Sequence, residues 1–323
     1  MTADPQPAVD QQAMSEFQQI VQMLESQDAA PELDSKSTTD LLSRFPDFAG
    51  VDARDVLIDG PHGDVPGRIY RGPEQSGTGL VWVHGGAFIG GDLDMLEAHW
   101  VSLALAARGF GVLSLDYRKA LRGVHYPVPS DDILAGWLWA NAHAPELGAR
   151  PDDLHLGGAS AGANLVAGVT KRARDGAGPL PASLMLVYPI VHPELPPLTS
   201  ELREKLTTEK AAVSLPAETV REFNLQYAGS EDVFGDPYAF AVNGPLAGQP
   251  PVYILNSEID FLRASGEAYG ADLRAAGVDV TVETEPETHH GHVNGPDEPG
   301  APASLDRLTA WLRDHASKES HGT

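Results

Sequence analysis

A serine flanked by small residues is the strongest chemical signal in this sequence. The stretch LHLGGASAGANLV holds Gly158, Ser160 and Gly162 in a G-x-S-x-G pattern, between a strand-like apolar run and a helix-like run. Small residues two positions either side permit a sharp strand-to-helix turn that exposes the hydroxyl beside a helix N-terminus, which favours negative charge. The pattern indicates a nucleophilic serine. Taken alone, it also fits a turn with a capping serine or a loop that cradles a phosphate.

A second glycine-rich loop follows an earlier apolar strand. In VWVHGGAFIGG, His84 precedes Gly85, Gly86 and Ala87. Backbone N–H groups in such a loop can point at a developing oxyanion. We therefore predict an oxyanion hole made by the N–H groups of Gly85, Gly86, Ala87 and Ala161, with the ring of His84 bracing the loop.

A nucleophilic serine also needs a base and an acid that orients the base. When the nucleophilic serine stands on a strand-to-helix turn of this kind, the order along the chain is serine, carboxylate, histidine. ILNSEIDFLRASG offers Glu258 and Asp260, and ETHHGHVNG offers His289, His290 and His292. Both stretches follow predicted strands, so their side chains are expected at the carboxyl edge of the sheet. The residues alone leave these candidates open.

The three histidines also raise the alternative of a metal site. His290 and His292, two apart on an extended segment, could share a face and bind one ion, whereas His289 would point away. A zinc site needs a third and usually a fourth ligand, and neither an HEXXH helix nor a paired carboxylate motif lies near them. The chain also contains no cysteine. We expect neither a metal nor another cofactor.

The rest of the sequence predicts the elements that hold these residues. Apolar strand-like runs alternate with helical patterns, which implies a mainly parallel sheet covered on both faces. The expected strands are 54–59, 65–72, 79–84, 111–117, 153–160, 183–190, 250–257 and 278–285, and the expected helices between and after them are 95–109, 130–142, 161–175, 266–277 and 304–316. An amphipathic helix near residues 14–27 should lie outside this core, and the charged insertion 194–234 is expected to be a lid or another functional element and not a bare loop.

The amino-acid composition limits the classes of molecule that this protein is expected to bind. Lys and Arg total 22 against 46 Asp and Glu, a net charge of −24 that would repel nucleic acids and anionic membranes. There is no long apolar run and no secretory signal at the N-terminus. We expect a soluble cytoplasmic protein that acts on a small molecule, and the sequence leaves a homodimer open.

The motifs HGGAF, GASAGAN, LNSEIDFLRASG and HHGH together resemble the bacterial hormone-sensitive-lipase-like esterases of the α/β-hydrolase fold, from about residue 55 to the end. The resemblance implies a mostly parallel eight-stranded sheet flanked by helices and covered by a helical cap. It assigns residues 1–50 and 194–234 to the cap, and residues 51–193 and 235–323 to the catalytic core.

The same resemblance implies a role for each candidate residue. Ser160 corresponds to the nucleophile, Asp260 to the acid, because it stands two residues before a leucine-arginine pair, and His290 to the base, because it precedes a glycine. His289 and His292 become neighbours whose replacement should leave substantial activity. The implied activity is a serine carboxylesterase for small to medium uncharged esters. An amidase or lactonase with the same triad, or a non-catalytic receptor such as the gibberellin receptors on this fold, is the alternative.

Overall fold

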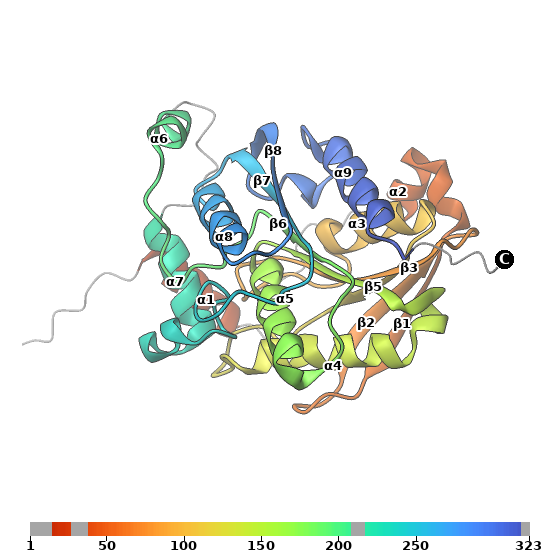
Figure 1. The fold of residues 1–323 in the computed structure, drawn as a ribbon, viewed down its shortest axis with the longest axis horizontal. Coiled ribbons are helices and arrows are strands. Elements are labelled where there is room, and N and C mark those ends of the chain that lie inside the picture. The colour runs from red at the N-terminus through yellow and green to blue at the C-terminus, as the bar shows by residue number, and fades with distance from the viewer. Residues whose placement is uncertain (1–14, 27–37, 208–216, 318–323) are drawn as a thin grey trace, which may run out of the picture.

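The structure, a computed structural model, describes residues 15–26, 38–207 and 217–317. It is built on an eight-stranded sheet with the order β1-β2-β4-β3-β5-β6-β7-β8 (Figure 1). The β1–β2 and β2–β4 pairs are antiparallel, and the other five pairs are parallel. The strands are β1 (Asp52–Ile58), β2 (Val65–Arg71), β3 (Gly77–Val83), β4 (Gly111–Leu115), β5 (Ala149–Ala159), β6 (Leu184–Val187), β7 (Val252–Ile259) and β8 (Val280–His289). The predicted sheet is confirmed.

Helices cover both faces of this sheet, which explains why its central strands are apolar without alternation. All five residues of β4 and six of the seven in β3 are buried. One face packs on α3 (Leu96–Ala107) and α9 (Ala301–Asp314), and the other on α4 (Val128–Ala142), α5 (Ala161–Arg172) and α8 (Arg263–Ala275). The short helical segments are α6 (Ser200–Leu206), η2 (Ala144–Leu147), η3 (Ala173–Ala177), η5 (Glu231–Gly235) and η6 (His292–Asn294). Because helices cover both faces of the central strands, the functional loops are expected at the strand ends.

The helix predicted near residues 14–27 packs on a helix of the inserted segment. Figure 1 shows α1 (Glu16–Ser26) beside α7 (Ala217–Ala228). The rings of Phe17 and Phe223 meet edge to face, with their centroids 4.7 Å apart. Ile89, from the glycine-rich loop after β3, belongs to the same apolar cluster. The two helices therefore lie over that loop.

The remainder of the predicted N-terminal cap segment packs differently. α2 (Thr38–Arg44) and the 3₁₀ helix η1 (Pro46–Gly50) place Leu41 and Phe48 in the apolar cluster of α3 and α9. This part of the predicted 1–50 segment lies with the core helices, because its apolar side chains contact them. Residues 1–14 and 27–37 of that segment, and residues 208–216 of the predicted 194–234 insertion, lie outside the described residues. The division into cap and core segments stays a prediction.

The sequence also predicts no membrane partner and leaves a homodimer open. In the described ranges, no helix combines the length and apolar character needed to cross a bilayer. The cytoplasmic location and the homodimer stay predictions.

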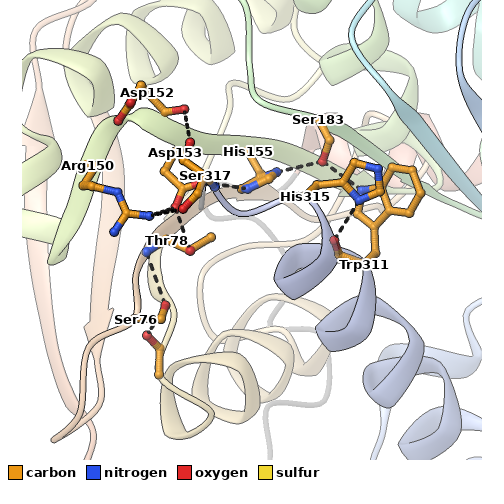
Figure 2. Close-up of polar contacts among 11 residues, drawn as sticks. Ser76, Thr78, Arg150, Asp152, Asp153, His155, Ser183, Trp311, His315 and Ser317 are labelled. Atoms are coloured by element: carbon orange, nitrogen blue, oxygen red, sulfur yellow. Dashed lines mark hydrogen bonds and ion pairs between the residues drawn. The ribbon is translucent and has the colours of Figure 1, made fainter. Parts of the chain in front are cut away.

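Besides the predicted Ser160, Asp260 and His290, another serine, histidine and aspartate lie close together (Figure 2). They lie at the amino-terminal end of the parallel strands, whereas Ser160 follows the carboxyl end of β5. His155 Nδ1 lies 2.7 Å from Ser183 Oγ, and His155 Nε2 lies 3.6 Å from Asp153 Oδ1. All three side chains are fully buried. Ser183 Oγ also accepts a hydrogen bond from the Trp311 indole at 2.8 Å, and Asp153 accepts one from the backbone N–H of Ser317. This buried set holds α9 and the segment after it against β5, and Ser183 is closed to a substrate.

We expect Ser183→Ala to lower the free energy of unfolding by about 1–3 kcal/mol, because it leaves the buried Trp311 and His155 nitrogens without their shared partner. Urea unfolding followed by tryptophan fluorescence measures this loss. Ser317→Ala is the matched control, since it removes a hydroxyl near the surface of the same cluster and should change stability by at most about 0.5 kcal/mol. Equal stability of the two variants would contradict the assigned role of Ser183.

Candidate active site

Ser160 occupies a sharp turn between β5 and α5. Its backbone angles are φ 52° and ψ −118°, a conformation that costs a non-glycine residue about 1–3 kcal/mol. The flanking glycines make room for this turn: a Cβ on Gly162 would lie 2.3 Å from the Val83 carbonyl oxygen, and one on Gly158 would lie 2.7 Å from the backbone of Gly162. The G-x-S-x-G pattern is therefore a packing requirement that places the serine beyond the carboxyl end of β5.

Ser160, His290 and Asp260 form one chain of hydrogen bonds across three strand ends. Ser160 Oγ lies 3.0 Å from His290 Nε2, and His290 Nδ1 lies 2.8 Å from Asp260 Oδ2. Because a carboxylate only accepts hydrogen bonds, Nδ1 carries the proton and Nε2 is left to accept the proton of the serine hydroxyl. The backbone N–H of Leu262 donates to Asp260 Oδ1 at 3.0 Å and fixes the carboxylate. The geometry is that of a nucleophile, a base and an orienting acid.

Two carboxylates, Asp260 and Glu97, raise the proton affinity of His290. Burial by itself lowers the pKa of His290, but the charge and hydrogen bond of Asp260, together with the charge of Glu97, outweigh burial and raise that pKa above its usual value. A base with a higher proton affinity takes the serine proton more readily, and the imidazolium that forms is stabilised by the same carboxylates. The site is therefore suited to general-base chemistry.

Glu258, the other candidate acid, has different partners. Its Oε1 accepts from Lys205 Nζ at 2.9 Å, and its Oε2 accepts from the backbone N–H of Glu287 at 2.7 Å. The Glu287 amide and the Lys205 ammonium lower the pKa of Glu258. Lys205 belongs to α6, so Glu258 joins that helix to β7, and the structure brings Asp260 to His290 instead.

The oxyanion loop, residues 84–90 after β3, places two predicted donors at the serine. Gly86 and Ala87 line the same cavity as Ser160, and within the described part of the chain neither of their N–H groups has an acceptor. Gly86 has φ 107°, and a Cβ there would lie 2.3 Å from the Gly90 carbonyl oxygen. Ala161 is the first residue of α5, where a backbone N–H has no intrahelical acceptor. These three N–H groups are available to an oxyanion.

Gly85, the fourth predicted donor, is engaged elsewhere. Its N–H donates to Glu97 Oε2, so the prediction that it serves the oxyanion is wrong. A Cβ on Gly85 would lie 2.8 Å from that oxygen and 3.0 Å from the Ser160 Cβ, which explains the glycine. The Gly85 carbonyl accepts from the Tyr117 hydroxyl at 3.0 Å and lies 2.7 Å from His84 Nδ1. His84 thus lies where a brace for the loop was predicted.

Two buried residues at the site were not predicted from the sequence. Glu97 is 1% exposed, and Tyr188 is fully buried just after β6. The Tyr188 hydroxyl donates to Glu97 Oε1 at 2.5 Å, and its ring meets the His290 ring edge to face with centroids 4.9 Å apart. The available signal was a carboxylate inside the apolar helical run LEAHWVSLALAA. That signal marks an unusual residue without identifying its partners.

A cavity of about 250 Å³ opens beside the serine and the base. Its walls are mainly apolar. The lining residues are Gly86, Ala87, Met95, Glu97, Ser160, Ile190, Phe223, Leu262, His290 and Asn294. A larger depression of about 730 Å³ lies between β1 and α4, and its lining includes neither the serine nor the base. Of these two cavities, only the smaller one contains a nucleophile.

His292, one of the two histidines beside His290, is held by two serine hydroxyls. His292 is 3% exposed, and its Nδ1 and Nε2 lie 2.8 Å from Ser257 Oγ and 2.7 Å from Ser304 Oγ. Burial, followed by the charge of His290, lowers the pKa of His292 to about 4, so its ring is neutral near pH 7 and links β7 to α9. Across residues 15–26, 38–207 and 217–317, no three His, Cys, Asp or Glu side chains are grouped to hold a metal ion. The limited effect expected of replacing His289 or His292 stays a prediction.

Known proteins resemble this chain in sequence and in fold. A family described as alpha/beta hydrolase fold matches residues 80–294. The chain is 32% identical over 298 residues to Esterase LipI of Mycobacterium tuberculosis, covering 90% of each protein. It is 35% identical over 284 residues to the carboxylic ester hydrolase LipN of the same organism, covering 83% of this chain and 72% of LipN. The structure of EstE1, a thermophilic and thermostable carboxylesterase cloned from a metagenomic library, matches with a TM-score of 0.75 and 26% identity over 94% of this chain and 98% of EstE1. The chain therefore belongs to the α/β-hydrolase fold family, among its hormone-sensitive-lipase-like esterases.

Proposed function

We propose that this chain is a serine carboxylesterase that hydrolyses small to medium uncharged esters through an acyl-enzyme. The observation that carries the proposal is the hydrogen-bonded chain from Ser160 through His290 to Asp260, beside three available backbone N–H groups. The relatives named as an esterase and a carboxylic ester hydrolase support the same reaction class.

In the proposed reaction, Ser160 Oγ attacks the ester carbonyl carbon while its proton passes to His290 Nε2. The negative oxygen of the tetrahedral intermediate accepts hydrogen bonds from the oxyanion loop and from Ala161. Protonated His290 then gives its proton to the alcohol oxygen as the C–O bond breaks, which leaves the acyl group on Ser160. Water deprotonated by the same imidazole hydrolyses the acyl-enzyme, while Asp260 holds the ring.

The cavity supports the proposed size and charge of the substrate. About 250 Å³ is at the small end for ligand sites, and Ile190, Phe223 and Leu262 give it apolar walls. The carboxylates of Glu97 and Asp260 lie close to the reacting groups and would repel an anionic substrate. Short, uncharged acyl or alcohol groups therefore suit this pocket.

A tagged, activated phosphonate tests the proposal directly. We expect one covalent adduct on the peptide that contains Ser160, none on the Ser160→Ala protein, and slower labelling when a short-chain ester competes for the site. Intact-mass and peptide mass spectrometry measure the adduct. A protein that binds ligands without turnover, as the receptor alternative requires, would leave Ser160 unlabelled and hydrolyse no ester.

Matched acetyl ester, acetanilide and lactone substrates complete this test. We expect the ester to have the highest kcat/KM, and within a series of p-nitrophenyl esters we expect kcat/KM to fall once the acyl chain outgrows the cavity. A higher kcat/KM for the anilide or the lactone would contradict the proposal in favour of an amidase or a lactonase.

A further inference from the structure

A buried carboxylate contacts the oxyanion loop directly. Glu97 lies in the apolar helix α3 and is 1% exposed. Its Oε2 accepts from the backbone N–H of Gly85, immediately before the two predicted donors of that loop. Its backbone carbonyl accepts from the Trp82 indole at 2.9 Å, which fixes the residue itself. The position of the Gly85 amide is therefore set by Glu97.

The second oxygen of Glu97 leads to the loop that carries the base. Oε1 accepts from the Tyr188 hydroxyl at 2.5 Å. The Tyr188 ring lies edge to face with the rings of both His290 and His292, at centroid distances of 4.9 Å and 5.4 Å. Tyr188 thus contacts the histidine loop, residues 289–294, through its ring.

We propose that Glu97 is a positioning residue, which holds the oxyanion loop and the histidine loop at a fixed separation. It does so through its hydrogen bonds with Gly85 and Tyr188 and through the ring contacts of Tyr188 with the histidine loop. The inference rests on the proposed function, because it assigns Glu97 a role in the same site. An apolar side chain in this helix would avoid the cost of desolvating a carboxylate, but it would leave the Gly85 N–H and the Tyr188 hydroxyl without an acceptor.

The charge of Glu97 has two opposed effects on the proposed reaction. A negative charge beside the oxyanion loop opposes the oxyanion, but the N–H of Gly85 and the hydroxyl of Tyr188 both donate to it and offset that effect. The same charge favours the imidazolium form of His290, and it acts together with Asp260 to raise the pKa of the base. Glu97 therefore supports the proton transfer from Ser160 while it positions the donors.

Glu97→Gln separates this role from simple packing. Glutamine keeps the shape and one acceptor oxygen for Gly85, but it is uncharged and its NH₂ group cannot accept from Tyr188. We expect kcat for a short p-nitrophenyl ester to fall about 10- to 100-fold, because small displacements of catalytic groups have effects of this size, while KM changes little. Removing a negative charge lowers the pKa of His290, so we also expect the acid limb of the kcat/KM profile to move to lower pH. A packing role alone would leave that limb in place.

Tyr188→Phe provides an independent variant that keeps the carboxylate and its contact with Gly85. We expect it to lower kcat as well, and the Glu97→Gln/Tyr188→Phe protein to lose less than the product of the two single losses, because both act through one chain. Ser183→Ala is the matched control: it loses buried hydrogen bonds far from the site and should keep wild-type kcat per folded molecule. Thermal unfolding of every variant gives the folded fraction.

Wild-type kcat with an unmoved acid limb in Glu97→Gln would overturn the inference. If that variant does not fold, wild-type kcat in Tyr188→Phe would overturn it instead. Ser160→Ala in the same assay separates a failure of the proposed function from a failure of this inference. Full activity of Ser160→Ala would reject the proposed function itself. Loss of activity in Ser160→Ala beside unchanged activity in Glu97→Gln would reject only the role of Glu97.

Discussion

Alanine at Ser160 or at His290 is expected to lower kcat for p-nitrophenyl acetate by about a million-fold, whereas alanine at His289 should leave it close to the wild-type value. Ser160 Oγ and His290 Nε2 lie 3.0 Å apart and would act in one step, since the serine is a weak nucleophile until the ring takes its proton. Without either side chain, only binding and the backbone donors are left to assist attack by water. Initial-rate kinetics corrected for spontaneous hydrolysis measure the loss.

The double variant gives the stronger form of this prediction. Ser160→Ala/His290→Ala should be no slower than either single variant, because groups that act as a unit are not additive. Two independent losses that multiply would contradict a shared step. A large loss in His289→Ala together with a small one in His290→Ala would contradict the assignment of His290 and make His289 the base.

The predictable parts of this fold depend on local patterns. The strands β3 and β4 were recognisable as uninterrupted apolar runs, because helices cover both of their faces and no position needs to be polar. The turn at Ser160 was visible for a similar reason: the residues that make room for it, Gly158 and Gly162, stand within two positions of it. Information that is local in the sequence was sufficient for both.

The features of the site that the sequence does not predict depend on contacts between residues far apart in the chain. Gly85 belongs to a glycine-rich loop of the expected kind, but its N–H meets Glu97, twelve positions later, and the other carboxylate oxygen meets Tyr188, 91 positions after that. His292 likewise takes its partners from Ser257 and Ser304, which lie 35 and 12 positions away. No period or motif encodes these pairs, because they depend on how α3, β7 and α9 pack around the strand ends.

The N-terminal segment shows the same limit on a larger scale. Its amphipathic pattern predicted a helix outside the main core, and α1 does pack on α7. The pattern could not tell which apolar surface each following helix would contact, and α2 and η1 pack with α3 and α9. Amphipathicity indicates that a face is buried, whereas the partner of that face depends on the tertiary structure.

Asp260→Asn is expected to lower kcat/KM by about ten-thousand-fold, with the fold retained. The backbone N–H of Leu262 donates to Asp260 Oδ1 at 3.0 Å and would keep the amide oxygen at that position. The amide NH₂ would then face His290 Nδ1, where the carboxylate now accepts at 2.8 Å. To accept from that NH₂, the ring must move its proton to Nε2, and a protonated Nε2 cannot take the proton of Ser160.

Glu258→Gln is the matched control for this carboxylate-to-amide change. Its oxygen can still accept from the Glu287 N–H, and the loss of the charged contact with Lys205, a partly exposed pair, should have a small effect. We therefore expect kcat/KM close to wild type and unchanged labelling by the phosphonate, whereas labelling of Asp260→Asn should slow in proportion to its kcat/KM. A larger loss in Glu258→Gln than in Asp260→Asn would move the acid to Glu258. Equal losses in the two variants would mean that neither carboxylate orients the base alone.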